Sequence, residues 1–247
     1  MARIYDATRN EDVRHPRARQ MSANDLSNVH FLHIGKTGGT AVKYALTRAD
    51  TGPLLHLHLH NHGTRLVDIP KGELVVFFLR DPITRFVSGF LSRQRQGKPR
   101  YNFPWSEAEA RAFSRFQTAN ELGVALSSDD RGLRNAAAAA MNGIQHVRDS
   151  FWRWLGTEDE LLRRKSDLLF IGQQEYLTDD AAVMATRLKI GALKLPSDEV
   201  ESHRNPGHLN RSPESQAIAN LRQWYNADYE ALCFASKLHG SLDSVDP

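Results

Sequence analysis

The stretch of this chain best suited to chemistry is a glycine-rich loop at residues 34–40, which reads Ile-Gly-Lys-Thr-Gly-Gly-Thr. An apolar run, 29–34, precedes it, and an amphipathic segment, 41–49, follows it. A strand, a glycine loop and a helix start in that order place backbone N–H groups and a helix N-terminus around an anion. The loop is therefore predicted to bind a phosphate or a sulfate through Gly35, Lys36, Thr37, Gly38, Gly39 and Thr40.

The order of residues in the loop differs from that of a Walker A loop. Lys36 comes before Gly38-Gly39-Thr40, whereas a Walker A lysine follows the last glycine and directly precedes Ser or Thr. This order fits a phosphosulfate better than a nucleoside triphosphate. A glycine-rich turn without a ligand is the simpler alternative, and the loop alone leaves it open.

A second candidate begins at Arg80, directly after the apolar run 73–79. Arg80 stands at the expected carboxyl end of a strand, where open α/β sheets bind ligands. Ser88 follows two helical turns later, so Arg80 and Ser88 are placed to hold one phosphate from two sides. The alternative is an N-capped helix whose arginines face solvent.

Histidines recur at every second position in a third segment, His56-Leu57-His58-Leu59-His60-Asn61-His62. In a strand these histidines share one face. Histidine is the side chain best suited to accept a proton near neutral pH, which predicts a general base here. A metal site and an inert polar strand face are the alternatives.

Together the loop at 34–40 and the stretch Arg80-Asp81-Pro82 through Ser88 resemble the two phosphate motifs of sulfotransferases that use 3′-phosphoadenosine 5′-phosphosulfate (PAPS). The carbohydrate branch that includes heparan sulfate 2-O-sulfotransferase is the most similar. Weaker matches follow at Phe170–Glu175 and Trp224–Glu230. One departure is Gly35, where many members have proline.

The resemblance implies a reaction and a set of roles. A sulfuryl group would pass from PAPS to a hydroxyl acceptor, a saccharide or glycoconjugate such as a glycan or glycolipid, by in-line displacement. Lys36 would stabilise the leaving phosphate, and Arg80 and Ser88 would bind the 3′-phosphate. A His-x-His pair supplies the base in that branch, and His60-Asn61-His62 matches it best, with His58-Leu59-His60 as the alternative. The resemblance implies no metal requirement.

Two other function classes compete with a sulfotransferase. A nucleotide-dependent kinase would need a Mg²⁺ carboxylate site after a strand, which the sequence does not offer convincingly. The number of arginines in the sequence is compatible with a non-catalytic module that binds anions or nucleic acids. However, a net charge of +3 is low for a protein that holds a polyphosphate. No nucleic-acid partner is therefore expected.

Composition sets broader limits. The chain has 247 residues, 40% hydrophobic and 25% charged, which suffices for one α/β domain with a buried core. No run approaches the roughly 20 apolar residues of a membrane span, and there is no apolar signal segment at the N-terminus. The single cysteine, Cys233, makes an intrachain disulfide impossible. These features favour a cytoplasmic protein without a transmembrane segment.

These motifs need a scaffold, and the pattern predicts an α/β protein with a central parallel sheet flanked by helices, the P-loop-like sulfotransferase fold. Residues 1–28 are expected to form a flexible arm, and 29–247 a single sulfotransferase domain. Apolar runs predict strands at 29–34, 54–59, 73–79 and 167–172.

Helices are expected between and after the strands. The predicted ranges are 41–49, a segment opening at Asp81-Pro82, 107–155, 179–190 and 213–238. Thr40 is the predicted N-cap of the first helix, and Asp81 of the second. A polar loop, Ser202–His208, is assigned a weak role over the ligand. Three arginines just past the second motif line either an acidic acceptor's path or the surface: Arg93, Arg95 and Arg100.

Overall fold

The computed structural model describes residues 27–53, 55–198 and 213–243. Most of the expected arm and the loop Ser202–His208 lie outside these ranges. Within them, no helix is both long and apolar enough to cross a membrane.

Four parallel strands form the centre of the fold, in the order β2-β1-β3-β4. Their bounds are β1 Ser27–Leu32, β2 Leu55–Leu59, β3 Leu74–Leu79 and β4 Leu168–Gln173. The predicted α/β class and its central parallel sheet are confirmed, and β1 begins two residues before the expected strand start at Val29, so it includes the last two residues of the expected arm. The chain leaves β1 for β2 on one side and returns to β3 on the other, so the carboxyl ends of β1 and β3 flank a topological switch point.

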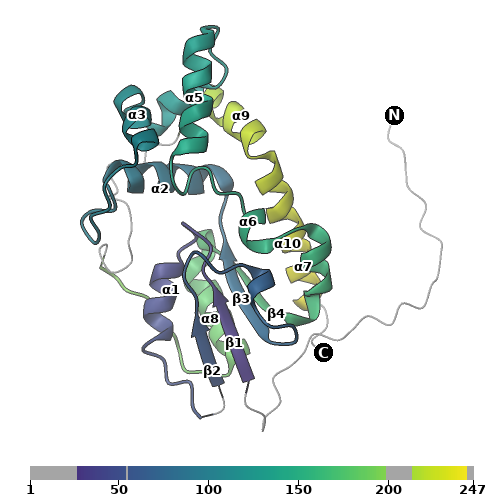
Figure 1. Cartoon of the computed structure of the whole chain (residues 1–247). Coiled ribbons are helices and arrows are strands. Elements are labelled where there is room, and N and C mark those ends of the chain that lie inside the picture. Colours follow the sequence, from purple (N-terminus) through teal and green to yellow (C-terminus); the bar gives the residue numbers. More distant parts are fainter. Residues whose placement is uncertain (1–26, 54, 199–212, 244–247) are drawn as a thin grey trace, which may run out of the picture.

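Helices cover both faces of the sheet (Figure 1). On one face, α1 (Gly39–Leu46) and α8 (Leu177–Leu188) pack on the strands through a shared core. On the other lie α6 (Trp152–Leu155), α7 (Glu158–Arg163) and α10 (Asn226–Asp243). Strand β3 is buried along its whole length, because it is paired on both edges and covered on both faces.

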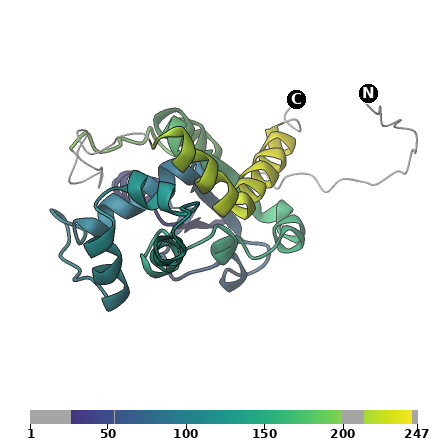
Figure 2. The ribbon, with the colours of Figure 1, turned by 90° about the horizontal axis from the view of Figure 1, so that it is seen from above.

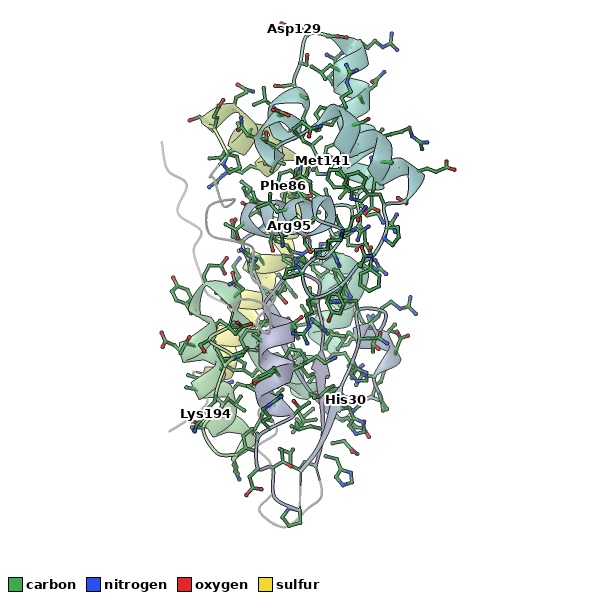
Figure 3. The ribbon with its side chains drawn as sticks, turned by 90° about the vertical axis from the view of Figure 1, so that its left-hand side faces the viewer. His30, Phe86, Arg95, Asp129, Met141 and Lys194 are labelled. Carbon is green, nitrogen blue, oxygen red and sulfur yellow. The ribbon has the colours of Figure 1, made fainter. Side chains whose placement is uncertain are left out.

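A layer of helices with its own core lies beyond the carboxyl ends of the strands (Figures 1 and 2). It comprises α2 (Pro82–Gln94), α3 (Glu107–Arg115), α4 (Ala119–Ala125), α5 (Arg131–Gly143) and α9 (Ser215–Trp224). Figure 3 shows Phe86 and Arg95 along α2, with Met141 above them and His30 on the sheet below. Short 3-10 turns complete the fold at Leu66–Asp68, Lys165–Asp167 and Gln174–Tyr176.

The helical region expected at 107–155 is confirmed, and it consists of four helices, in which Thr118 and Asp130 cap new starts with their side chains. The single final helix expected at 213–238 is wrong, because it breaks at Tyr225 into α9 and α10. The buried hydroxyl of Tyr225 donates to the carbonyl of Val147 at 2.8 Å.

Candidate functional site

A cavity of about 1310 Å³ lies between the carboxyl edge of the sheet and the helical layer. Seven of the predicted site residues line it: Lys36, Gly38, Gly39, Thr40, His62, Arg80 and Ser88. Three predicted residues do not: Gly35, Thr37 and His60. The Thr37 side chain is buried in the loop, where its hydroxyl donates to the carbonyl of Ile34 at 3.0 Å.

The glycine loop enters α1 without a capping side chain. Gly38 adopts a left-handed conformation, with φ of 84°, and the helix begins at Gly39. The prediction that Thr40 caps this helix is therefore wrong, because the backbone bend at Gly38 starts it. The backbone N–H groups of residues 36–40 have no hydrogen-bond acceptor among the described residues. They are free to bind an anion.

Lys36 is the cationic residue of the loop. Within the described ranges no carboxylate forms an ion pair with it. Burial, reinforced by the charges of Arg80, Arg95 and Arg85, lowers its pKa to about 7. A buried ammonium group without a counter-ion is costly. An anion bound in the cavity would remove that cost. It would also raise the pKa of Lys36 and so favour its protonated form.

Arg80 adds a second charge beside the loop. Its Nη1 donates to the carbonyl of Lys36 at 3.3 Å, and its Nε donates to the hydroxyl of Thr84 at 3.0 Å. Burial lowers the pKa of its guanidinium, which nevertheless stays charged. Ser88, buried on α2, and Lys43, on α1, line the same cavity.

The start of α2 is held by contacts from two distant segments. The predicted N-cap is confirmed, since Asp81 Oδ1 accepts the N–H of Thr84 at 2.8 Å. Its Oδ2 accepts the hydroxyl of Tyr229 at 2.9 Å, and Glu175 accepts the N–H of Asp81 at 2.9 Å. The two segments with weaker motif matches, 170–175 and 224–230, thus both fix the start of α2, which carries Ser88 and directly follows Arg80 and Asp81.

Arg85 stabilises the backbone of the glycine loop. Its Nε donates to the carbonyl of Gly35 at 2.9 Å, and its Nη1 lies 3.8 Å from Asp228 Oδ1. The guanidinium lies over the Phe151 ring, 4.7 Å from its centroid. Its buried Nη2 has no hydrogen-bond partner in the described part of the chain. The charge therefore serves to hold the backbone of the loop.

Three histidines meet at the floor of the cavity: His33 after β1, His62 after β2, and His146 after α5. The ring centroids of His33 and His62 are 4.0 Å apart, and those of His62 and His146 are 5.7 Å apart. Burial lowers the pKa of His33 to about 2 and that of His146 well below its usual value. Both rings are therefore neutral at physiological pH.

The ring of His62 is in a tautomer that can accept a proton. Its Nδ1 lies 3.1 Å from the carbonyl oxygen of His33. A carbonyl only accepts, so Nδ1 carries the hydrogen and Nε2 keeps its lone pair. Desolvation, with the charges of Lys36 and Lys43, lowers the pKa of His62 although the hydrogen bond to His33 opposes this. The indole of Trp154 donates to the carbonyl of His62 at 2.9 Å and fixes its backbone.

His60 belongs to a different cluster. Its Nε2 lies 2.8 Å from Nδ1 of His30, whose Nε2 in turn contacts Glu73 at 2.5 Å. His58 stacks on His30 with ring centroids 4.5 Å apart. This histidine column follows the sheet face away from the cavity. No group of three or more His, Cys, Asp or Glu side chains in the described ranges is arranged to hold a metal ion.

Sequence reasoning missed His33 and His146. His33 had a usable signal, because it directly follows the apolar run of β1 and so stands at the sheet's carboxyl edge. His146 had none, because it lies in a connection after α5 and only tertiary packing brings it to His62.

Gly39 is required by the position of His33. A Cβ at residue 39 would overlap with the His33 imidazole. We therefore expect Gly39→Ala to lower the free energy of unfolding by about 1–3 kcal/mol, measured by urea denaturation. Gly191→Ala is the control, because a Cβ there meets nothing within 4 Å, and it should shift stability by no more than about 0.5 kcal/mol. Equal stability of the two variants would contradict the packing of His33 on the loop.

The fold and the site together define an α/β protein with a cationic, histidine-floored cavity at the carboxyl edge of a parallel sheet. Neither protein-family models nor curated proteins match this chain in sequence.

Proposed function

We propose that this protein is a sulfotransferase of the P-loop-like fold that moves a sulfuryl group from PAPS to the hydroxyl of a saccharide or glycoconjugate. One observation carries the proposal. A single cavity holds Lys36 and loop N–H groups that have no partner among the described residues, beside a neutral His62 whose Nε2 is available as a base. Such a cavity offers an anion cradle and a proton acceptor side by side.

The residues present fit the donor. Lys36 and the N–H groups of residues 36–40 would hold its 5′-phosphosulfate end, and Arg80 and Ser88 its 3′-phosphate. The volume of about 1310 Å³ exceeds the roughly 300–1,000 Å³ of ordinary ligand pockets, as two substrates require. With the donor bound, its sulfur is the electrophile that an acceptor hydroxyl attacks.

In the reaction, His62 Nε2 takes the hydroxyl proton while the acceptor oxygen bonds to sulfur. The bond from sulfur to the phosphate oxygen breaks, and its electron pair stays on that oxygen. Lys36 and the loop N–H groups stabilise the charge that develops there. His60 has no part in this scheme, because its ring is engaged with His30 outside the cavity.

A kinase is the less favoured function. The carboxylate directly after β3, where a nucleotide-dependent kinase would need a Mg²⁺ ligand, is Asp81. Both of its oxygens already accept hydrogen bonds, from Thr84 and Tyr229. Using it as a metal ligand would uncap α2.

Thermal unfolding with ligands tests the function. We expect 3′-phosphoadenosine 5′-phosphate at about 100 times its Kd to raise Tm by roughly 5–10 °C, and ATP with Mg²⁺ to raise it less. The reverse order would favour the kinase. Formation of a sulfated product from PAPS, detected by mass spectrometry, is the direct assay.

Arg80→Ala tests the donor's orientation. It should weaken binding of 3′-phosphoadenosine 5′-phosphate by roughly ten- to a hundredfold, while adenosine 5′-phosphosulfate, which lacks the 3′-phosphate, loses much less. Arg48→Ala is the control, because Arg48 lies over the Tyr44 ring on α1 outside the cavity. Equal losses for both ligands would remove Arg80 from the 3′-phosphate site.

A further inference from the structure

The cavity has a second wall whose chemistry differs from that of the glycine loop. The connection between α2 and α3 contributes Tyr101, Phe103 and Trp105, which are 40%, 57% and 38% exposed. The rings of Tyr101 and Phe103 stack, with centroids 5.3 Å apart and planes 29° apart. Neighbouring exposed aromatic rings at a cavity are typical of a ligand-binding surface. We call Tyr101, Phe103 and Trp105 the aromatic wall.

The aromatic wall is anchored to the helical layer. The indole N–H of Trp105 donates to the carbonyl of Arg93 at 2.7 Å, and its ring lies 5.1 Å from the Phe113 ring, centroid to centroid. Arg93 also donates to the carbonyls of Phe103 and Pro104, at 3.4 and 3.2 Å. A ligand therefore meets rings that are already in place, which reduces the entropy lost on binding.

One arginine is held at the base of this wall, and another lies against one of its rings. Arg93 is buried in a two-pronged pair with Glu109, at 2.6 and 2.8 Å. Although burial opposes it, the hydrogen bonds from Arg93 lower the pKa of Glu109 to about 2, so the pair is fixed as an ion pair. Arg100 lies over the Tyr101 ring, with its guanidinium carbon 5.7 Å from the ring centroid. The other cations that line the cavity in the described ranges are on the opposite side: Lys36 and Lys43 at the loop and α1, and Arg80 at the end of β3.

We propose that the aromatic wall binds the acceptor, and that the acceptor is a ring compound bearing a hydroxyl group. This inference rests on the proposed function. The apolar C–H face of a pyranose and the face of a phenol both stack on an aromatic ring. An acyclic acceptor has no ring face to pack on this wall and is therefore selected against.

Matched acceptors test the ring. With PAPS, we expect phenyl β-glucoside to exceed sorbitol, an acyclic polyol without a ring face, by at least about tenfold in kcat/KM. Methyl β-glucoside and phenol, used separately, show which kind of ring is sulfated. A kcat/KM for sorbitol equal to that for phenyl β-glucoside overturns the proposal.

Removing one ring tests the wall itself. Phe103→Ser should raise KM for the preferred ring acceptor about tenfold and leave kcat and the affinity for 3′-phosphoadenosine 5′-phosphate unchanged. Leu162→Ser is the control, because Leu162 is 54% exposed on α7 and lies outside the cavity. An unchanged KM in Phe103→Ser overturns the proposal.

Direct binding separates this inference from the proposed function. Phenyl β-glucoside is titrated into the donor-free protein while tryptophan fluorescence is recorded. Binding that Phe103→Ser abolishes supports the aromatic wall, even if PAPS gives no product and the proposed function fails. Absence of binding to the wild-type protein overturns the inference, even if 3′-phosphoadenosine 5′-phosphate binds.

Discussion

Lys36→Met is expected to reduce sulfuryl transfer by roughly 10²- to 10³-fold, the usual effect of removing a group that stabilises charge in the transition state. Met keeps the length of the side chain but not its charge. The loss should fall mainly on kcat, because the charge on the leaving phosphate develops as the sulfuryl group departs. The measurement is steady-state kinetics with PAPS and the best acceptor. Wild-type kcat in Lys36→Met would exclude the proposed role.

Lys36 also predicts a proton linked to binding. Its pKa of about 7 leaves it mostly neutral at pH 8.5 in the free protein. A bound phosphate favours the ammonium form, so binding of 3′-phosphoadenosine 5′-phosphate should take up about one proton at pH 8.5 and far less at pH 6. Calorimetric titration in buffers of different ionisation enthalpy measures this uptake. Lys36→Arg is the matched control, because it keeps the charge without titrating, and uptake that persists in it would contradict the assignment.

His62→Gln is expected to lower kcat by roughly 10²- to 10⁴-fold, as for loss of a general base. Donor binding should be unchanged, because the glutamine amide keeps most of the side chain's volume. The substitution also removes no charge, since the His62 ring is neutral. His58→Gln is the control, since His58 stacks on His30 in the column outside the cavity. If His62→Gln kept full activity while His58→Gln lost it, the base would lie in the column.

The pH profile separates the two residues. His62 must be neutral, and its pKa lies below 6.5, so the acid limb of kcat/KM should fall below pH 6.5. Lys36 must be protonated, and its pKa in the free protein is about 7, so kcat/KM should decline as the pH rises above about 7. The alkaline limb of kcat should lie at higher pH, because the bound donor raises the pKa of Lys36. His62→Gln should flatten only the acid limb.

The sheet and the cationic side of the site could be predicted from the sequence, because both depend on neighbours along the chain. Apolar runs gave all four strands to within about two residues. The loop at 34–40 and Arg80 each directly follow a strand, and parallel strands bring their carboxyl ends to one edge. Asp81 caps α2 through Thr84, three residues away. The Thr40 cap failed because a glycine bend, invisible to capping preferences, starts α1.

The histidine that faces the cavity, and the other residues that line it, could be identified only from the packing of separate elements. Side chains alternate between the two faces of a sheet only within a strand, and β2 ends at Leu59. His60 still pairs with His30 across the sheet, whereas His62 lies past the turn beneath His33. Arg93 is neutralised by Glu109, 16 residues later, and the Arg85 that holds Gly35 is 50 residues away. Such contacts depend on how separate elements pack, and no pattern within one segment encodes that packing.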